Sequence, residues 1–227
     1  MFYYTSKLIK NNFQSATENI FYTLYHKNDS KIHEVLISQQ KKNNSILEKY
    51  YDDYITQVSS SKMAISLESA STIFTLVNFL KPKSILDLGS GFTSLLFRLY
   101  RKERKEEVMV VSIDNNIHWL NKSSDFLEKY DLRDDNFYLS DEFFSHSRDK
   151  FDFIINDYSS GDERDQMTKM IPSFSTENAS IIFDDMQHYG HKSNVMKLIL
   201  FNRYNYMDLK HYTLDSINRY QWLLLNK

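Results

Sequence analysis

The chain reads Ser84-Ile85-Leu86-Asp87-Leu88-Gly89-Ser90-Gly91-Phe92-Thr93-Ser94 at the point that decides its fold. Residues 84–88 form a short, mostly apolar run typical of a buried strand, and the residues from about 93 onward have helical spacing. The glycines between them are two of only four in the chain, the others being Gly161 and Gly190. Because glycine is so scarce elsewhere, this pair indicates a tight strand-to-helix turn that requires it.

Strand-like and helical runs alternate outward from this turn. Strands are predicted at 84–88, 108–113, 137–139, 151–155 and 179–183, and helices at 67–80, 93–103, 117–130, 164–171 and 191–201. This alternation implies right-handed crossovers and a parallel sheet. Two last strands, 206–212 and 220–225, have no helix between them and predict an antiparallel hairpin. The expected fold class is therefore α/β, with a Rossmann-like, mostly parallel sheet closed by a C-terminal antiparallel hairpin.

The first sixty residues have a different pattern. They contain no glycine or proline, and apolar residues recur at helical spacing, as in Ile20 and Leu24 and again in Ile32 and Leu36. A break is expected near residues 27–30. We predict an N-terminal helical segment at 1–59, acting as a lid or a dimer contact, before a main domain at 60–227.

Composition excludes several classes of protein. The absence of cysteine removes disulfides, thiolate metal sites and cysteine nucleophiles. A net charge of −2 provides no general attraction to nucleic acid. No apolar run approaches the roughly 20 residues of a membrane helix. We therefore expect a cytoplasmic protein that acts on a small-molecule substrate, without nucleic-acid or membrane partners and with a homodimer as one option.

The ends of the first two predicted strands favour an adenosine-containing ligand. In doubly wound sheets ligands bind beyond the carboxyl ends of the strands, and the first turn is rich in glycine so that the backbone approaches the ligand. Asp114 ends the second strand 25 positions after Gly89 (114 − 89), where an acid can accept both ribose hydroxyls. Ser94 stands where a dinucleotide fingerprint has its third glycine, which disfavours a nicotinamide dinucleotide. The alternative is a tight turn that binds nothing.

Residues 84–94 resemble motif I of class I S-adenosylmethionine-dependent methyltransferases, and the alternation with its hairpin is similar to the seven-stranded sheet of that family. The resemblance covers about residues 63–227 and implies S-adenosyl-L-methionine as the cofactor. It also implies that Asp87 and Gly89 border the methionine part, that Asp114 holds the ribose and that Asp141 lies near the adenine. The cofactor-binding residues predicted in this way are Asp87, Gly89, Ser90, Gly91, Asp114, Asn115, Asp141 and Asp157.

Aspartates follow the fourth and fifth predicted strands. Asp157 follows one, and Asp184 and Asp185 follow the other. Neighbouring strands lie about 4.8 Å apart, so the three carboxylates converge if these strands are adjacent. Carboxylates that close repel unless a positive group lies between them, and Mg²⁺ or another divalent cation is one solution that would also activate a substrate hydroxyl. The alternative is that the aspartates only cap helices and turns.

The same three aspartates resemble the metal ligands of cation-dependent O-methyltransferases of the catechol and caffeoyl-coenzyme A kind, with Asp185 in place of the usual asparagine. Small bacterial methyltransferases with two aspartates after the fifth strand match equally well. The resemblance implies O-methylation of a small hydroxylated molecule, with Asp157, Asp184 and Asp185 around a cation. His188 or Asp185 is the expected base, because an imidazole pKa near 6.5 suits proton transfer at neutral pH. Other candidates for the base are Tyr158, His191 and Lys192.

Two other functions remain open at this point. The same fold transfers aminopropyl or aminocarboxypropyl groups of related cofactors to amines, and an acidic site without metal would suit a cationic acceptor. A non-catalytic cofactor-binding module is the second alternative, favoured if the three aspartates turn out to be dispersed.

Overall fold

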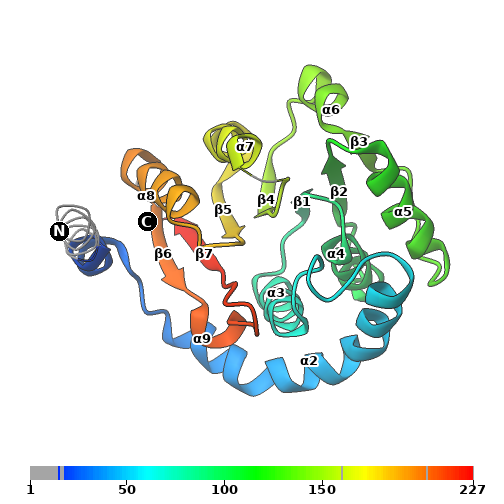
Figure 1. Cartoon of the computed structure of the whole chain (residues 1–227), viewed down its shortest axis with the longest axis horizontal. Helices are drawn as coiled ribbons and strands as arrows, with labels where there is room; N and C mark the ends of the chain where they lie inside the picture. Colours follow the sequence, from blue (N-terminus) through cyan, green and yellow to red (C-terminus); the bar gives the residue numbers. More distant parts are fainter. Residues whose placement is uncertain (1–14, 16–17, 160, 203, 227) are drawn as a thin grey trace, which may run out of the picture.

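The computed structural model describes residues 15, 18–159, 161–202 and 204–226. Its centre is a seven-stranded sheet in the order β3-β2-β1-β4-β5-β7-β6 (Figure 1). The strands are β1 (Ser84–Leu88), β2 (Met109–Asp114), β3 (Phe137–Leu139), β4 (Phe151–Asn156), β5 (Ser175–Phe183), β6 (Tyr204–Asp208) and β7 (Trp222–Asn226). The first five are parallel, and β7 is antiparallel to both of its neighbours, β5 and β6. The predicted parallel sheet with a closing antiparallel pair is confirmed.

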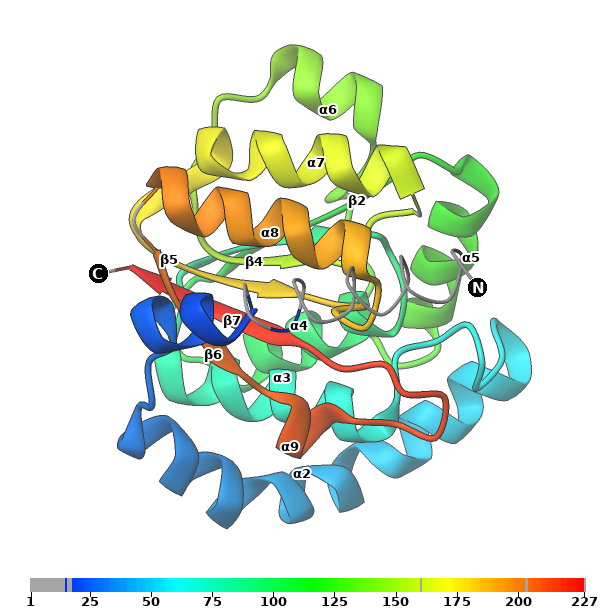
Figure 2. The same ribbon diagram turned by 60° about the vertical axis from the view of Figure 1, so that its left-hand side comes forward.

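Helices cover both faces of the sheet (Figure 2). They are α2 (Ser30–Gln57), α3 (Leu67–Leu80), α4 (Phe92–Glu103), α5 (Ile117–Glu128), α6 (Ser140–His146), α7 (Gly161–Phe174), α8 (Tyr189–Asn202) and α9 (Lys210–Thr213). One hydrophobic cluster joins α2, α3, α4 and α5 to one face, and a second joins α6, α7 and α8 to the other. Among the helices described, none has a stretch long and apolar enough to cross a membrane.

The C-terminal part corrects one sequence prediction. The expected strand at 206–212 ends at Asp208, and Lys210–Thr213 forms α9 instead. The backbone N–H groups of Tyr212 and Thr213 both donate to the carbonyl of Leu209, which closes a helical turn where the strand pattern predicted extension. Helix α6 was also not predicted, because a seven-residue helix is too short to show a periodic pattern.

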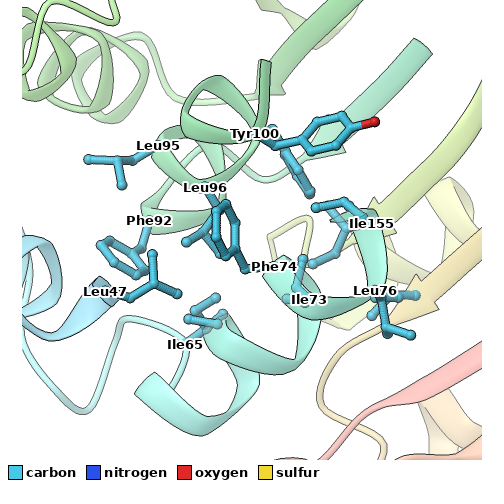
Figure 3. Packing of buried hydrophobic residues seen from close by; sticks show 14 of the residues in the cluster. Leu47, Ile65, Ile73, Phe74, Leu76, Phe92, Leu95, Leu96, Tyr100 and Ile155 are labelled. Atoms are coloured by element: carbon cyan, nitrogen blue, oxygen red, sulfur yellow. The ribbon is translucent and has the colours of Figure 1, made fainter. Parts of the chain in front are cut away.

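Helix α2 is attached to the main domain by a buried apolar face. It begins after Asp29, whose carboxylate accepts from the N–H groups of Lys31 and Ile32, so the predicted break at 27–30 is confirmed. Figure 3 shows Leu47 of α2 packed near Ile65 and Phe92 of the main domain. The boundary near residue 60 stays a prediction, but α2 and the sheet domain share one hydrophobic cluster.

Adjacent residues of α2 provide a test of this attachment. Leu47 is fully buried, whereas Ile46 is 43% exposed. We expect Leu47→Ala to lower the free energy of unfolding by about 2–5 kcal/mol, because it leaves a cavity against α3 and α4. The matched variant Ile46→Ala should stay within about 0.5 kcal/mol of the parent. Urea denaturation of both proteins measures the difference, and equal stabilities would mean that α2 does not contribute to the core.

Candidate active site

A cavity of about 670 Å³ lies at the carboxyl ends of the parallel strands. Residues 89–93 and 114–116 form one side, after β1 and β2, and Asp157, Asp184 and Asp185 form the other, after β4 and β5. Tyr54 of α2 and residues 62–65 add a wall from the N-terminal part. Its volume is within the range of small-molecule sites, and its place is the one where doubly wound sheets bind ligands. We call it the central cavity.

Gly89 makes the close approach of two strand ends possible. Its φ is +98°, a conformation that side chains disfavour, and a Cβ atom there would lie 2.3 Å from the carbonyl oxygen of Asp157. Backbone hydrogen bonds hold this contact, since the N–H of Gly89 donates to Ile113 and the N–H of Asp157 donates to Leu88, both at 2.9 Å. The glycine turn therefore brings Asp157 to the wall of the central cavity.

Asp87 lies beneath the glycine turn and is fully buried. Its carboxylate accepts from the hydroxyls of Thr93 at 2.7 Å, Ser94 at 2.5 Å and Ser112 at 2.9 Å. Burial raises the pKa of Asp87 to about 6, although the three hydrogen bonds act to lower it. Asp87 is not part of the cavity wall, so its predicted contact with the cofactor stays a prediction, whereas its support of the turn is direct.

Asp114 lines the central cavity at the end of β2. One carboxylate oxygen accepts from the N–H and hydroxyl of Ser90, at 3.0 and 3.2 Å, and the other accepts from the N–H of Asn116 at 2.9 Å. The indole N–H of Trp119 donates to the carbonyl of Ser90 at 2.5 Å. These contacts fix the carboxylate against the turn, and Ser90 and Gly91 share the same wall.

Asn115 connects the central cavity to a second hollow of about 930 Å³. Its amide donates to Glu163 at 2.8 Å. Asp141, in the first turn of α6, is exposed and borders only this second hollow, together with Tyr158. Asn115 is therefore shared by the wall that carries Asp114 and the wall that carries Asp141.

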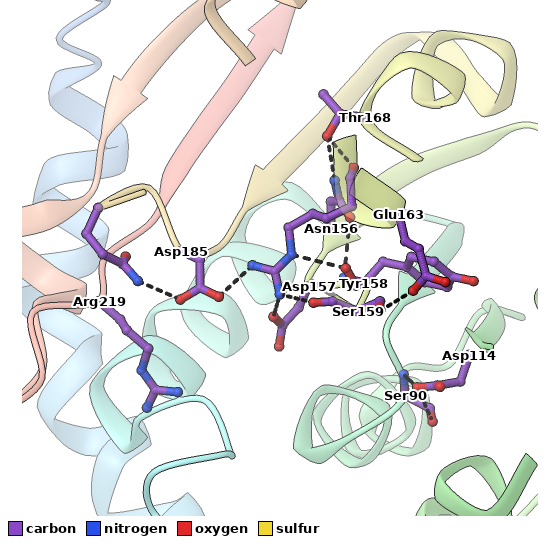
Figure 4. A network of polar contacts seen from close by, with 12 residues as sticks. Ser90, Asp114, Asn156, Asp157, Tyr158, Ser159, Glu163, Thr168, Asp185 and Arg219 are labelled. Atoms are coloured by element: carbon purple, nitrogen blue, oxygen red, sulfur yellow. Dashed lines mark hydrogen bonds and ion pairs between the residues drawn. The ribbon is translucent and has the colours of Figure 1, made fainter. Parts of the chain in front are cut away.

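The three aspartates after β4 and β5 meet, as predicted from adjacent strands. One oxygen from each of Asp157, Asp184 and Asp185 lies within 4.8 Å of the others, and we call these residues the acidic cluster. Arg164 of α7 lies against it: its guanidinium donates to Asp185 at 2.5 Å and to Asp157 at 3.1 Å. The two accepting aspartates are labelled in Figure 4. An arginine therefore supplies the positive charge beside these carboxylates, for which the sequence analysis gave a divalent cation as one solution.

Burial and mutual repulsion separate the pKa values in the acidic cluster. Burial, and next the charge of Asp184, raises the pKa of Asp157 well above its usual range. Burial and the charge of Asp185 raise the pKa of Asp184 to about 6. Burial, the largest single influence, acts to raise the pKa of Asp185, but the charge of Arg164 and the hydrogen bonds from Gln187 and Arg164 together outweigh it, so the net shift of this pKa is downward. Asp185 is therefore the carboxylate that stays ionised most readily, and its neighbours are able to hold a proton.

The donor set does not fit a divalent cation as it stands. Three carboxylates on one edge would suit Mg²⁺, which prefers oxygen ligands. Two of the three, however, are ion-paired to Arg164, whose side chain is only 9% exposed. A cation would have to displace this guanidinium or bind next to it, so we derive no chemical step through a metal.

The candidate bases differ in their access to the central cavity. His188 is exposed and lines it. His191 is buried, and its Nδ1 lies 3.6 Å from a carboxylate oxygen of Asp165. Burial lowers the pKa of His191 to about 4. Lys192 reaches Glu18 instead, and Tyr158 borders the second hollow. Of these candidates, His188 and the acidic cluster are the ones on the cavity wall.

The sequence interpretation missed Arg164, Tyr54 and Trp119. Arg164 had a usable signal, because three convergent carboxylates need compensation and this arginine follows Asp157 by only seven residues. No sequence signal marked Tyr54 and Trp119 as site residues, because an aromatic side chain on a helix is ordinarily interpreted as part of the hydrophobic core.

Comparison with known proteins agrees with this arrangement. No family model matches the chain, and no curated protein matches its sequence. Solved structures do match: an O-methyltransferase from Bacillus cereus in complex with SAH has 13% identity and a TM-score of 0.57 over 93% of this chain and 97% of that one. The O-methyltransferase TomG from Streptomyces achromogenes, in complex with SAM, has 11% identity and a TM-score of 0.55 over 93% and 96%.

A precorrin-6y C5,15-methyltransferase from Geobacter metallireducens also matches, with 14% identity and a TM-score of 0.57 over 73% of this chain and 92% of that one. The chain therefore has the Rossmann-like fold of class I S-adenosylmethionine-dependent methyltransferases. Because these identities are low, the likeness establishes the fold, and the reaction has to be argued from the site.

Proposed function

We propose that the chain is an S-adenosylmethionine-dependent methyltransferase that methylates a hydroxyl oxygen of a small molecule. The observation that carries this proposal is the central cavity, which has the glycine turn and Asp114 on one side and the acidic cluster on the other. A cofactor held at the first side would direct its methyl group toward the second. The fold and the SAM- and SAH-bound structures that share it support the same cofactor.

The proposed cofactor contacts follow the cavity wall. Asp114 accepts the ribose hydroxyls, the backbone of Gly89, Ser90 and Gly91 borders the methionine part, and the adenine extends past Asn115. Asp141 is then an outer contact of the second hollow. Asp157 would border the place where the methyl group meets the acceptor, and Asp87 would support the glycine turn from beneath the cavity.

When bound, the cofactor supplies a sulfonium methyl group that is already activated for transfer. The residues of the chain align the acceptor oxygen with that carbon and accept its proton. Transfer would form an O–C bond as the S–C bond broke, with the electron pair of that bond left on sulfur. We propose Asp185 or His188 as the proton acceptor, because Asp185 stays ionised and His188 is the histidine on the wall.

Two variants of this function differ in what the acidic cluster does. A divalent cation at Asp157, Asp184 and Asp185 is supported by the 4.8 Å spacing of their oxygens and opposed by the ion pairs to Arg164. An amine acceptor, for methyl or aminopropyl transfer, is favoured by carboxylates that hold no metal. Tyr54 on the cavity wall supports a role of α2 as part of the cover, and a homodimer contact through the N-terminal segment remains a further proposal.

Cofactor binding tests the proposal directly. We expect S-adenosylmethionine to bind, and Asp114→Ala to weaken it by about 1.5–3 kcal/mol through the loss of charge-assisted hydrogen bonds. Asp125→Ala removes an exposed carboxylate of α5 and should leave affinity unchanged. Titration calorimetry measures both. Unchanged affinity in a folded Asp114→Ala protein would remove the ribose role, and tighter binding of NAD would overturn the cofactor assignment.

A further inference from the structure

Arg164 combines two kinds of contact that fix its guanidinium in place. Its Nε donates to the carbonyl of Tyr158 at 3.0 Å, and one terminal nitrogen donates to the carbonyl of Ser159 at 2.6 Å. The same head group donates to Asp157 after β4 and to Asp185 after β5. The arginine therefore ties the loop after β4 to both strand ends, and it is not a loosely held surface side chain.

This position is the one that a bridging ion would take between the two strand ends. Binding an ion requires free carboxylate oxygens at close range, and one oxygen of Asp157 and one of Asp185 already accept from Arg164. An incoming divalent ion would also lie beside a fixed positive charge. Because the guanidinium carries a permanent charge, the compensation does not depend on the supply of any ion.

We propose that Arg164 replaces a divalent cation at the acidic cluster, so that the methyl transfer proposed above, on which this inference rests, proceeds without a metal. Arg164 is a positioning residue in this account. It holds Asp157 and Asp185 at the acceptor end of the central cavity and leaves Asp184 without an ion pair among the described residues. The acceptor proton then goes to a carboxylate or to His188, and no metal-bound oxygen is needed.

Titration of the full chain with Mn²⁺ tests this proposal without any activity measurement, because Mn²⁺ favours carboxylate ligands. The wild-type protein should show no saturable binding up to millimolar Mn²⁺. Arg164→Met frees Asp157 and Asp185 from their ion pairs and should bind Mn²⁺ at least about tenfold more tightly than wild type. Arg164→Lys keeps a positive charge and should show no gain. Arg133→Met removes an exposed arginine that pairs with Asp125 and Glu128, and it is the matched control for charge.

The outcomes separate this inference from the proposed function. Saturable Mn²⁺ binding to the wild type that Asp184→Asn abolishes would overturn the inference, even if Arg164→Met failed to fold. A folded Arg164→Met protein without any gain in affinity would also overturn it, because the freed cluster would then not be a latent ion site. Failure of S-adenosylmethionine to bind the wild type would instead remove the proposed function and leave the Mn²⁺ result unchanged.

Discussion

Replacing Gly89 with alanine is expected to lower the free energy of unfolding by about 3–5 kcal/mol, the range of severe single substitutions. Two costs add at this position. Alanine disfavours a φ of +98°, and its Cβ would lie 2.3 Å from the carbonyl oxygen of Asp157. That oxygen belongs to the backbone, and the N–H of the same residue is hydrogen-bonded to Leu88, so relief requires the ends of β1 and β4 to separate.

Gly190 provides the matched control for this substitution. It lies at the start of α8, where an added Cβ would meet no other atom within 4 Å, and its φ is not positive. Gly190→Ala should therefore be neutral or stabilise the protein by up to about 1 kcal/mol. Urea denaturation of both variants measures the contrast. A Gly89→Ala protein within about 1 kcal/mol of wild type would mean that the turn tolerates a wider geometry and that its glycine is not a steric requirement.

Removing residues 1–59 is expected to prevent stable folding of the remaining chain. The sequence pattern alone suggests that residues 60–227 fold by themselves, with the first segment needed only for activity. In the structure, however, Ile32, Leu36, Leu47 and Tyr54 of α2 are buried against the main domain. Each such side chain contributes about 1.5–3 kcal/mol by burial. Together they are comparable to the whole stability of a domain, about 5–15 kcal/mol.

Circular dichroism and urea denaturation of residues 60–227 test this expectation. Addition of a peptide spanning residues 28–59 should restore a cooperative transition, because it returns the apolar face of α2. A truncated chain that unfolds cooperatively at nearly the wild-type midpoint would support the original boundary at residue 60. Activity of that truncated chain would further exclude a cover formed by α2 and Tyr54.

Local patterns in the sequence were sufficient for much of the sheet and its helices. Strands β1 and β3 and helix α3 have the predicted bounds, since apolar period and the stops at Gly89 and Pro82 act within a few residues. The meeting of Asp157 with Asp184 and Asp185 was predicted on the condition that β4 and β5 are neighbours, and the two strands are paired in the sheet. The roles of individual site residues stay predictions.

Contacts between distant parts of the chain decided the rest. The order of neighbouring residues shows the period of a helix and the position of a turn. These local patterns determined the α/β class, the glycine turn, and the strand ends at which Asp114 and the acidic cluster lie. Local sequence order does not determine which face of a helix packs against which other element of the fold. Packing alone placed α2 over α3 and α4, turned Lys210–Thr213 into α9, and brought the guanidinium of Arg164 between Asp157 and Asp185. Each of these depends on burial or charge compensation, which are properties of a surface formed only after folding.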